Sequence, residues 1–327
     1  MKKKHYNGIN ALRTIGCIGI VMMHMAANNN YMINGFIYKK IIPSFTDFVF
    51  IFMIVSAFGM CCGYYDRVIN NKLNLAKFYE RRIKKIFPFF GILVLIDVIV
   101  EHSLNSLYEG FADLTLLFGF IPRSLNVIGV GWFIGLIFIF YLIFPFFCFL
   151  IENKRRAWIS FVISLLYNYI SSYYFGLGRV NILYSGCFFL AGGLIYLYKD
   201  ELVKKYIYIY IILLIISIAL YYQISSVYFA LLVSILMLII AIISHDKILD
   251  NKVTKFFSDI SMEIYLSHML IFRVIQKLKI NVIFGNGWFQ YIITVGIVIA
   301  GASVFSLLVK QIIRIIEKRV AINTSIS

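Results

Sequence analysis

Long apolar runs recur from one end of the chain to the other, and they constrain the fold more than any other feature of the sequence. Most are long enough to cross about 30 Å of hydrocarbon as a helix, although 86–101 and 182–198 are short. We therefore predict an all-α integral membrane protein with about ten transmembrane helices. The predicted spans are 9–27, 45–65, 86–101, 130–151, 157–175, 182–198, 206–223, 226–244, 258–275 and 288–309.

The composition excludes a soluble globular domain. Of the 327 residues, 61% are hydrophobic and only 14% are charged, whereas a soluble domain carries roughly 25% charged residues. The sequence contains no internal repeat, no linker and no low-complexity tract. We therefore expect a single polytopic membrane domain over residues 1–327.

The formal charge of +16 is explained by membrane topology and not by nucleic acid. With a cytoplasmic N terminus, most Lys and Arg residues fall in loops on the inner side, and few fall on the outer side. This skew is the positive-inside bias, and it places both termini in the cytoplasm. Membrane lipid is therefore a predicted partner, and nucleic acid is not. The basic inner segments are 2–4, 67–85, 154–156, 199–205, 247–255 and 310–319.

The five cysteines all lie in apolar runs, and no pair has the spacing of a metal site. We expect packing roles for them and predict no bound metal.

The first apolar run contains two groups that are unusual in lipid, Arg13 and His24. They are 11 residues apart, so a helix places them on one face, about 16 Å apart along its axis. An intramembrane ionisable group costs at least about 2.5 kcal/mol and normally faces a cavity or a partner. Two simpler alternatives remain open: Arg13 extends to the inner interface, and His24 is a packing residue.

A cluster of cations, Arg81, Arg82, Lys84 and Lys85, precedes the third span. Arg82 and Lys85 share a helical face, as do Arg81 and Lys85. Such a patch can bind phosphates, with Arg acting as a bidentate fork. The alternative is plain anchoring on anionic lipid.

The run "DISMEIYLSHMLIF" at 259–272 brings Ser261, Tyr265 and His268 onto one helical face. A second intramembrane histidine strengthens the case for a cavity. Asp47, near the outer start of the second span, is a candidate for orienting His24 as a carboxylate orients a catalytic imidazole. It is equally a candidate for an exposed helix N-cap.

These segments, in this order, resemble the membrane acyltransferase 3 family. The resemblance covers most of the chain and rests on "NGINALRTIGCIGIVMMHMA", "VFIFMIVSAFGM", "FYERRIKKIFP", "GWFIGLIFIFYLIFP" and "IYLSHMLIF". Ala57 stands where this family usually has Gly. Lys85 stands where a second Arg is expected, so the charge is kept but the fork geometry is lost. Ile137 and Phe138 stand where the polysaccharide-modifying branch often carries acidic residues, so that branch is not assigned.

The resemblance implies a multi-pass protein of the bacterial plasma (inner) membrane. Its activity would transfer an acyl group, with acetyl as the default, from cytoplasmic acyl-CoA to a hydroxyl or amine of an extracytoplasmic carbohydrate. That acceptor would be an exopolysaccharide, a capsule, a cell-wall glycan or a lipid-linked precursor. Acetyl-CoA would be the donor of such an O-acetylation. The expected residues are His24, Arg13 and Asp47 for catalysis, Arg81, Arg82 and Lys85 for acyl-CoA, and Trp132, Tyr265 and His268 for the acceptor.

Two other functions stay open at this point. Intramembrane charges also suit a polysaccharide exporter, although no inverted repeat is visible. A non-catalytic subunit of a polysaccharide synthesis complex would tolerate the loss of both Arg13 and His24.

Overall fold

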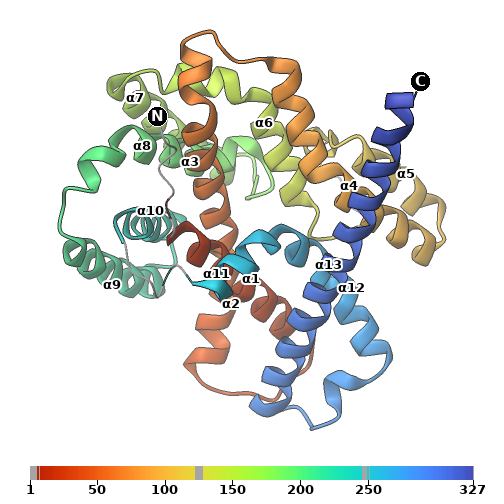
Figure 1. Cartoon of the computed structure of the whole chain (residues 1–327). Helices are drawn as coiled ribbons and strands as arrows, with labels where there is room; N and C mark the ends of the chain where they lie inside the picture. Colours follow the sequence, from red (N-terminus) through yellow and green to blue (C-terminus); the bar gives the residue numbers. More distant parts are fainter. Residues whose placement is uncertain (1–5, 7, 122–127, 245–248, 250, 327) are drawn as a thin grey trace. The chain divides into compact units, whose positions relative to one another are not determined.

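The computed structural model describes residues 6, 8–121, 128–244, 249 and 251–326, with side chains described as far as residue 319. All regular elements in these ranges are helices (Figure 1). The all-α prediction is therefore confirmed for the described chain. The basic segment 2–4 and Lys247 lie outside the described residues.

Each predicted span falls on a helix. The corresponding helices are α1 (Gly8–Ala27), α3 (Phe48–Ile69), α4 (Leu75–Glu101), α6 (Trp132–Leu150), α7 (Lys154–Tyr173), α8 (Ile182–Leu202), α9 (Ile207–Ile224), α10 (Val227–Ile243), α12 (Ser261–Lys277) and α13 (Trp288–Ile326). Shorter helices are α2 (Ile42–Ser44), α5 (Leu104–Leu114) and α11 (Lys252–Asp259).

Several of these helices are suited to crossing a membrane. Within the described chain, 6 helical segments are long and apolar enough by length and composition, and the apolar α10 is shorter. A multi-pass membrane protein is thus supported. The total of about ten spans and the cytoplasmic position of both termini stay predictions. The 6 segments are Gly8–Ala27, Ile37–Ile69, Trp132–Leu150, Ile182–Leu202, Ile207–Ile224 and Trp288–Arg319.

The helices gather into two compact units. The first unit comprises residues 1–16, 44–79 and 136–258, and the second comprises 17–43, 80–135 and 259–327. Helices α1, α4 and α6 begin in one unit and end in the other, so the division does not follow the order of the sequence.

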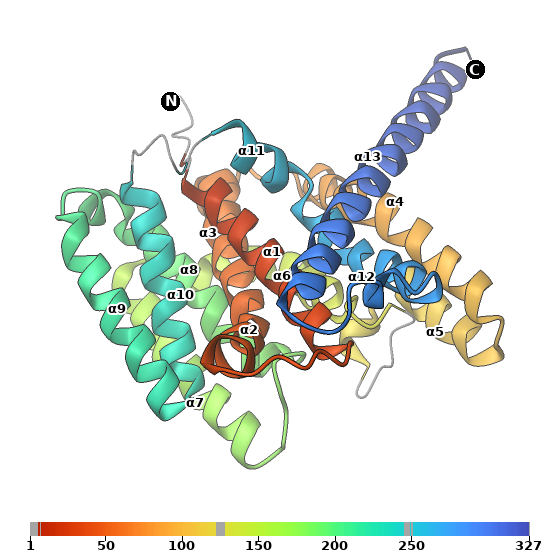
Figure 2. The ribbon, with the colours of Figure 1, turned by 90° about the horizontal axis from the view of Figure 1, so that it is seen from below.

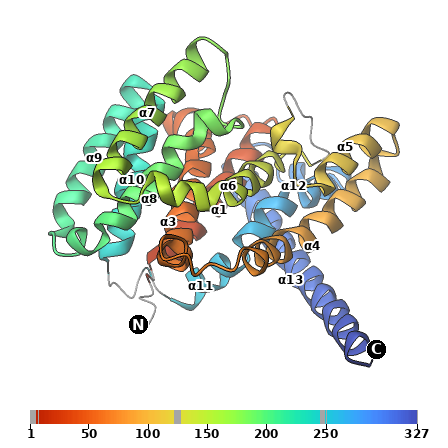
Figure 3. The same ribbon diagram turned by 90° about the horizontal axis from the view of Figure 1, so that it is seen from above.

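In the first unit, α8 packs against α3 and α7, and α10 packs against α9 (Figures 2 and 3). Gly192 of α8 makes the contact with α3 close, because a Cβ at this position would lie 2.4 Å from the Ile54 carbonyl oxygen. Phe188 of the same helix stacks on Phe50, with ring centroids 3.9 Å apart. A small residue therefore allows close approach of the backbones, and a large one fills the adjoining space, as is common between membrane helices.

In the second unit, α12 packs along α13 (Figure 2). The Glu263 carboxylate of α12 forms an ion pair of 2.9 Å with Lys310 of α13. The Tyr291 hydroxyl of α13 donates a hydrogen bond of 2.9 Å to the Met22 carbonyl of α1. Polar side chains thus join three helices of this unit.

We predict that Gly192→Ala destabilises the protein by about 1–3 kcal/mol, because the added methyl group meets backbone and cannot be accommodated by a rotamer change. Gly186 lies on the same helix with nothing within 4 Å of a built Cβ, so Gly186→Ala is the matched control. It should be neutral or gain up to about 1 kcal/mol of helix propensity. Thermal unfolding of both variants in detergent measures the difference, and equal melting temperatures would contradict this account of the α3–α8 contact.

Candidate functional site

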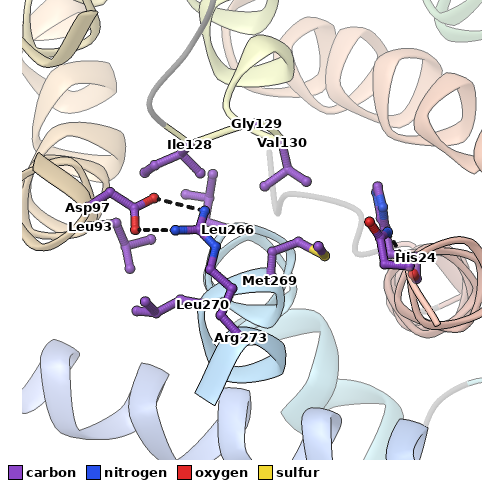
Figure 4. Close-up of a pocket in the computed structure, with 11 residues that line it drawn as sticks. His24, Leu93, Asp97, Ile128, Gly129, Val130, Leu266, Met269, Leu270 and Arg273 are labelled. Atoms are coloured by element: carbon purple, nitrogen blue, oxygen red, sulfur yellow. Dashed lines mark hydrogen bonds and ion pairs between the residues drawn. The ribbon is translucent and has the colours of Figure 1, made fainter. Parts of the chain in front are cut away.

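A cavity of about 300 Å³ opens within the second unit (Figure 4). Its volume is at the lower end of the range for small-molecule sites, about 300–1,000 Å³. Asp97 and Arg273 lie at one end and His24 lies at the other, with Val130 and Met269 between them. The lining residues are His24, Asn28, Leu93, Asp97, Ile128, Gly129, Val130, Leu266, Met269, Leu270 and Arg273.

Four segments of the chain supply this lining. They are the C-terminal end of α1, the C-terminal half of α4, residues 128–130 before α6, and residues 266–273 of α12. The topology predicted from the charge distribution places each of these on the outer side of the membrane. The cavity is therefore expected in the outer half of the bilayer.

His24 lies in the last turn of α1 and is half-buried. Arg13 lies on the same helix and is also half-buried, which confirms that one helix carries both residues. The His24 ring has the ring of His268 as a neighbour, with centroids 5.1 Å apart and planes tilted by 44°. The structure thus brings together two histidines that are 244 positions apart in the sequence.

His268 is completely buried and does not line the cavity. Its Nδ1 lies 2.6 Å from the Tyr265 carbonyl oxygen and 3.3 Å from that of Ile264. A carbonyl oxygen only accepts, so Nδ1 carries the proton, and in the neutral ring Nε2 bears a lone pair. Among the described residues, this buried Nε2 has no hydrogen-bond partner. His268 is therefore a neighbour of the cavity-lining His24 and is not itself part of the cavity wall.

Tyr265 fixes one wall of the cavity. Its hydroxyl donates a hydrogen bond of 2.8 Å to the Val130 carbonyl, and its ring packs edge-on against Phe133 at 5.6 Å. The segment before α6 is thereby tied to α12. Trp132 is half-buried beside Phe133, with ring centroids 5.8 Å apart, and does not line the cavity.

An ion pair that the sequence reasoning missed forms the wall opposite His24 (Figure 4). Arg273 of α12 binds Asp97 of α4 through two hydrogen bonds of 3.0 and 3.4 Å. The Asp97 side chain is 5% exposed and that of Arg273 is 37% exposed. The sequence offered one signal for this pair: an acid and a base, each near the predicted outer end of a different span. Only the tertiary structure shows that the two side chains meet.

The candidate phosphate-binding cations lie in the N-terminal half of α4. Arg81 and Lys85 are exposed and Arg82 is half-buried. Lys84 forms an ion pair of 2.6 Å with Glu80, and this hydrogen bond raises the pKa of Lys84. Lys85 precedes Asp97 by 12 residues, which is about 18 Å along a helix axis. One helix thus carries the cations in its N-terminal half and a cavity-lining acid in its C-terminal half.

Asp47 lies in the first unit, where its carboxylate accepts a hydrogen bond of 2.7 Å from the Tyr221 hydroxyl. It does not act as a side-chain N-cap for α3. His24 belongs to the second unit, so the predicted orientation of His24 by Asp47 stays a prediction.

The family model described as an acyltransferase domain, that of the acyltransferase 3 family, matches residues 6–307. This match covers nearly the whole chain, and the chain belongs to this family of membrane acyltransferases. No curated protein and no solved structure matches it. The resemblance inferred from the motifs is thereby confirmed. The described residues contain no group of three or more side chains suited to a metal ion.

We predict that Asp97→Ala destabilises the protein by about 2 kcal/mol, because Arg273 loses its partner; a fully buried pair would lose more. Adding Arg273→Met in the same chain should recover most of this loss, since no uncompensated charge then remains. Thermal unfolding of the single and double variants measures this coupling. The exposed Glu80–Lys84 pair is the control, and its loss should leave the melting temperature unchanged. If the double variant lost as much stability as the two single variants added together, Asp97 and Arg273 would not be a coupled pair.

Proposed function

We propose that this protein transfers an acyl group, with acetyl expected, from cytoplasmic acyl-CoA to a hydroxyl or amine of an extracytoplasmic carbohydrate. Membership of the acyltransferase family supports acyl transfer in general. One observation carries the finer statement. His24 opens onto a cavity with an ion pair at its far wall, formed by helix ends that the predicted topology places on the outer side.

The cations of α4 are proposed to hold the donor. Arg81, Arg82 and Lys85 would bind the phosphates of acyl-CoA at the cytoplasmic end, and Arg13 would assist at the entrance. Arg suits this work because its guanidinium binds phosphate oxygens in a bidentate manner. The pantetheine arm would then extend toward the outer half of the membrane and present its thioester near His24.

His24 is proposed as the general base. A neutral imidazole has an unperturbed pKa near working pH, which suits it to accept a proton from the acceptor hydroxyl. The acceptor oxygen attacks the thioester carbonyl carbon, the C–S bond breaks, and the sulfur takes the proton that His24 received. The products are the acylated carbohydrate and free CoA thiol, and no oxidant or metal enters the balance.

His268 is proposed to support His24 as a positioning residue. Its Nδ1 proton is donated to the Tyr265 carbonyl, which fixes the tautomer and leaves the lone pair on Nε2, on the side of the ring away from that bond. The neutral His268 ring packs beside the His24 ring. It can thereby fix the orientation of His24 without adding a positive charge to the site. Tyr265 would contribute by holding the cavity wall in place, and Trp132 stays a predicted contact for the acceptor.

We expect His24→Ala and Arg13→Ala each to reduce acyl transfer at least a hundredfold, while the protein stays folded in membranes. The measurement is incorporation of label from radioactive acetyl-CoA into glycan by membranes that contain each variant. His102 is an exposed histidine at the end of α4, and His102→Ala should retain full activity. Wild-type rates in His24→Ala would show that this role is wrong. An exporter would label no glycan from acetyl-CoA, and a non-catalytic subunit would be indifferent to both substitutions.

For the donor site, we expect Arg81→Ala, Arg82→Ala and Lys85→Ala each to raise the KM for acetyl-CoA about tenfold or more. A lost charge-assisted hydrogen bond costs about 1.5–3 kcal/mol, and about 1.4 kcal/mol is a factor of ten. Lys84→Ala is the matched control, because Lys84 belongs to the same cluster and is not proposed to bind the donor; its ammonium group forms an ion pair with Glu80. An equal KM in all four variants would mean that the cluster serves only to anchor the helix on lipid.

A further inference from the structure

The first unit contains a second cavity, of about 290 Å³. Its polar lining includes a carboxylate, a guanidinium, two phenols and two serine hydroxyls. These groups belong to Asp47, Arg179, Tyr184, Tyr221, Ser225 and Ser226. The acyl-transfer chemistry proposed above uses none of these side chains.

The two charges in this cavity offset each other and are held in place by the protein. Asp47 accepts a hydrogen bond of 2.7 Å from the Tyr221 hydroxyl. Arg179 donates to the hydroxyl of Thr46 and, at 3.2 Å, to the carbonyl of the same residue. A carboxylate has about four acceptor sites and a guanidinium has five donors, so each group can bind more than one partner at a time. A formally neutral site with donors and acceptors side by side suits a neutral ligand with several hydroxyl groups.

The aromatic side chains add a second requirement. Tyr184 and Tyr221 present rings together with their hydroxyls, and Phe50 adds a purely apolar ring. A ligand that fits must have an apolar face as well as hydroxyl groups. A sugar ring meets both requirements, because its C–H groups form faces and its hydroxyls lie around its edge.

The position of the cavity in the fold indicates the side from which a ligand enters. Asp47 precedes α3 and Arg179 precedes α8, whereas Tyr221 lies in the last turn of α9 and Ser226 caps the start of α10. The predicted topology places all four of these helix ends on the outer side. The ligand therefore belongs outside the cytoplasm.

The same features argue against other ligands. The Asp47 carboxylate opposes an anion such as the phosphates of acyl-CoA. An acyl chain would remove both charged groups from water without offering them hydrogen bonds. A divalent cation would find only one carboxylate among the lining residues.

We propose that this cavity binds a sugar unit of the acceptor glycan other than the one that is acylated. The proposal rests on the proposed function for the class of acceptor, since it extends acceptor recognition from one sugar to a glycan chain. Asp47 then serves acceptor binding in the first unit and not the orientation of His24.

The test is direct binding, measured without acyl transfer. The full-length protein in lipid nanodiscs is mixed with oligosaccharides released by mild acid from the cell surface of its source organism, and binding is followed by saturation-transfer NMR. Asp47→Asn and Tyr221→Phe should weaken binding at least tenfold. Tyr222→Phe is the matched control, because the neighbouring Tyr222 bonds to Ser44 at 2.8 Å and does not line the cavity. Val227→Phe narrows the cavity without removing a hydrogen bond and should also weaken binding.

The outcomes separate this inference from the proposed function. Acyl transfer by His24→Ala is measured in parallel, because that activity tests the proposed role of His24 and not the cavity of the first unit. If glycan binding depends on Asp47 and Tyr221 but His24→Ala still transfers acetyl groups, the role of His24 fails and this inference stands. Equal binding by wild type, Asp47→Asn, Tyr221→Phe and Val227→Phe would overturn the inference. Absence of binding by the wild type would overturn it as well.

Discussion

The low capacity of hydrocarbon to solvate charge governs this structure. A charged group inside a membrane-spanning helix is stable only beside a partner or a water-filled space. The chain meets this requirement with Asp97–Arg273 and Glu263–Lys310 in the second unit, and with the Asp47–Tyr221 hydrogen bond in the first. Each of these three carboxylates thus has a partner that the fold brings to it. Two of these pairs line the two described cavities: Asp97 and Arg273 line one, and Asp47 and Tyr221 line the other. At these positions protein groups, and not lipid, surround the charge.

Helix α4 shows how this constraint leads to function. Its N-terminal end is exposed and cationic, and its C-terminal half carries an acid buried against Arg273. A continuous helix fixes the separation of these two features at about 1.5 Å per residue. A donor held by its phosphates and an acceptor held in the cavity would therefore be kept at a constant distance. The proposed reaction needs this arrangement because the phosphates and the acceptor are expected on opposite sides of the membrane.

The elements of the fold were largely predictable from the sequence. Every predicted span falls on a helix, because a run of apolar residues in lipid must satisfy its backbone hydrogen bonds internally. The ends of the helices were less predictable. Helix α4 begins at Leu75, well before the predicted start at residue 86, because its basic first turns are helical although they are not apolar. Of the candidate site, the spacing of Arg13 and His24 placed them on one helix. Asp97 was missed, since a single acid in an apolar run does not reveal its partner.

By itself, the sequence determined the helices, the orientation expected from the distribution of Lys and Arg, and the family, because each depends on residues that are close together in the chain. Only the tertiary structure decided which helices meet. It placed His268 beside His24, Arg273 against Asp97 and Tyr221 against Asp47. The partners in each pair are more than 170 residues apart, and in a chain so rich in apolar residues many helix faces are equally suited to contact. The fit of small against large side chains decides which helix faces pack together, and the local periodicity of the sequence does not reveal which faces fit.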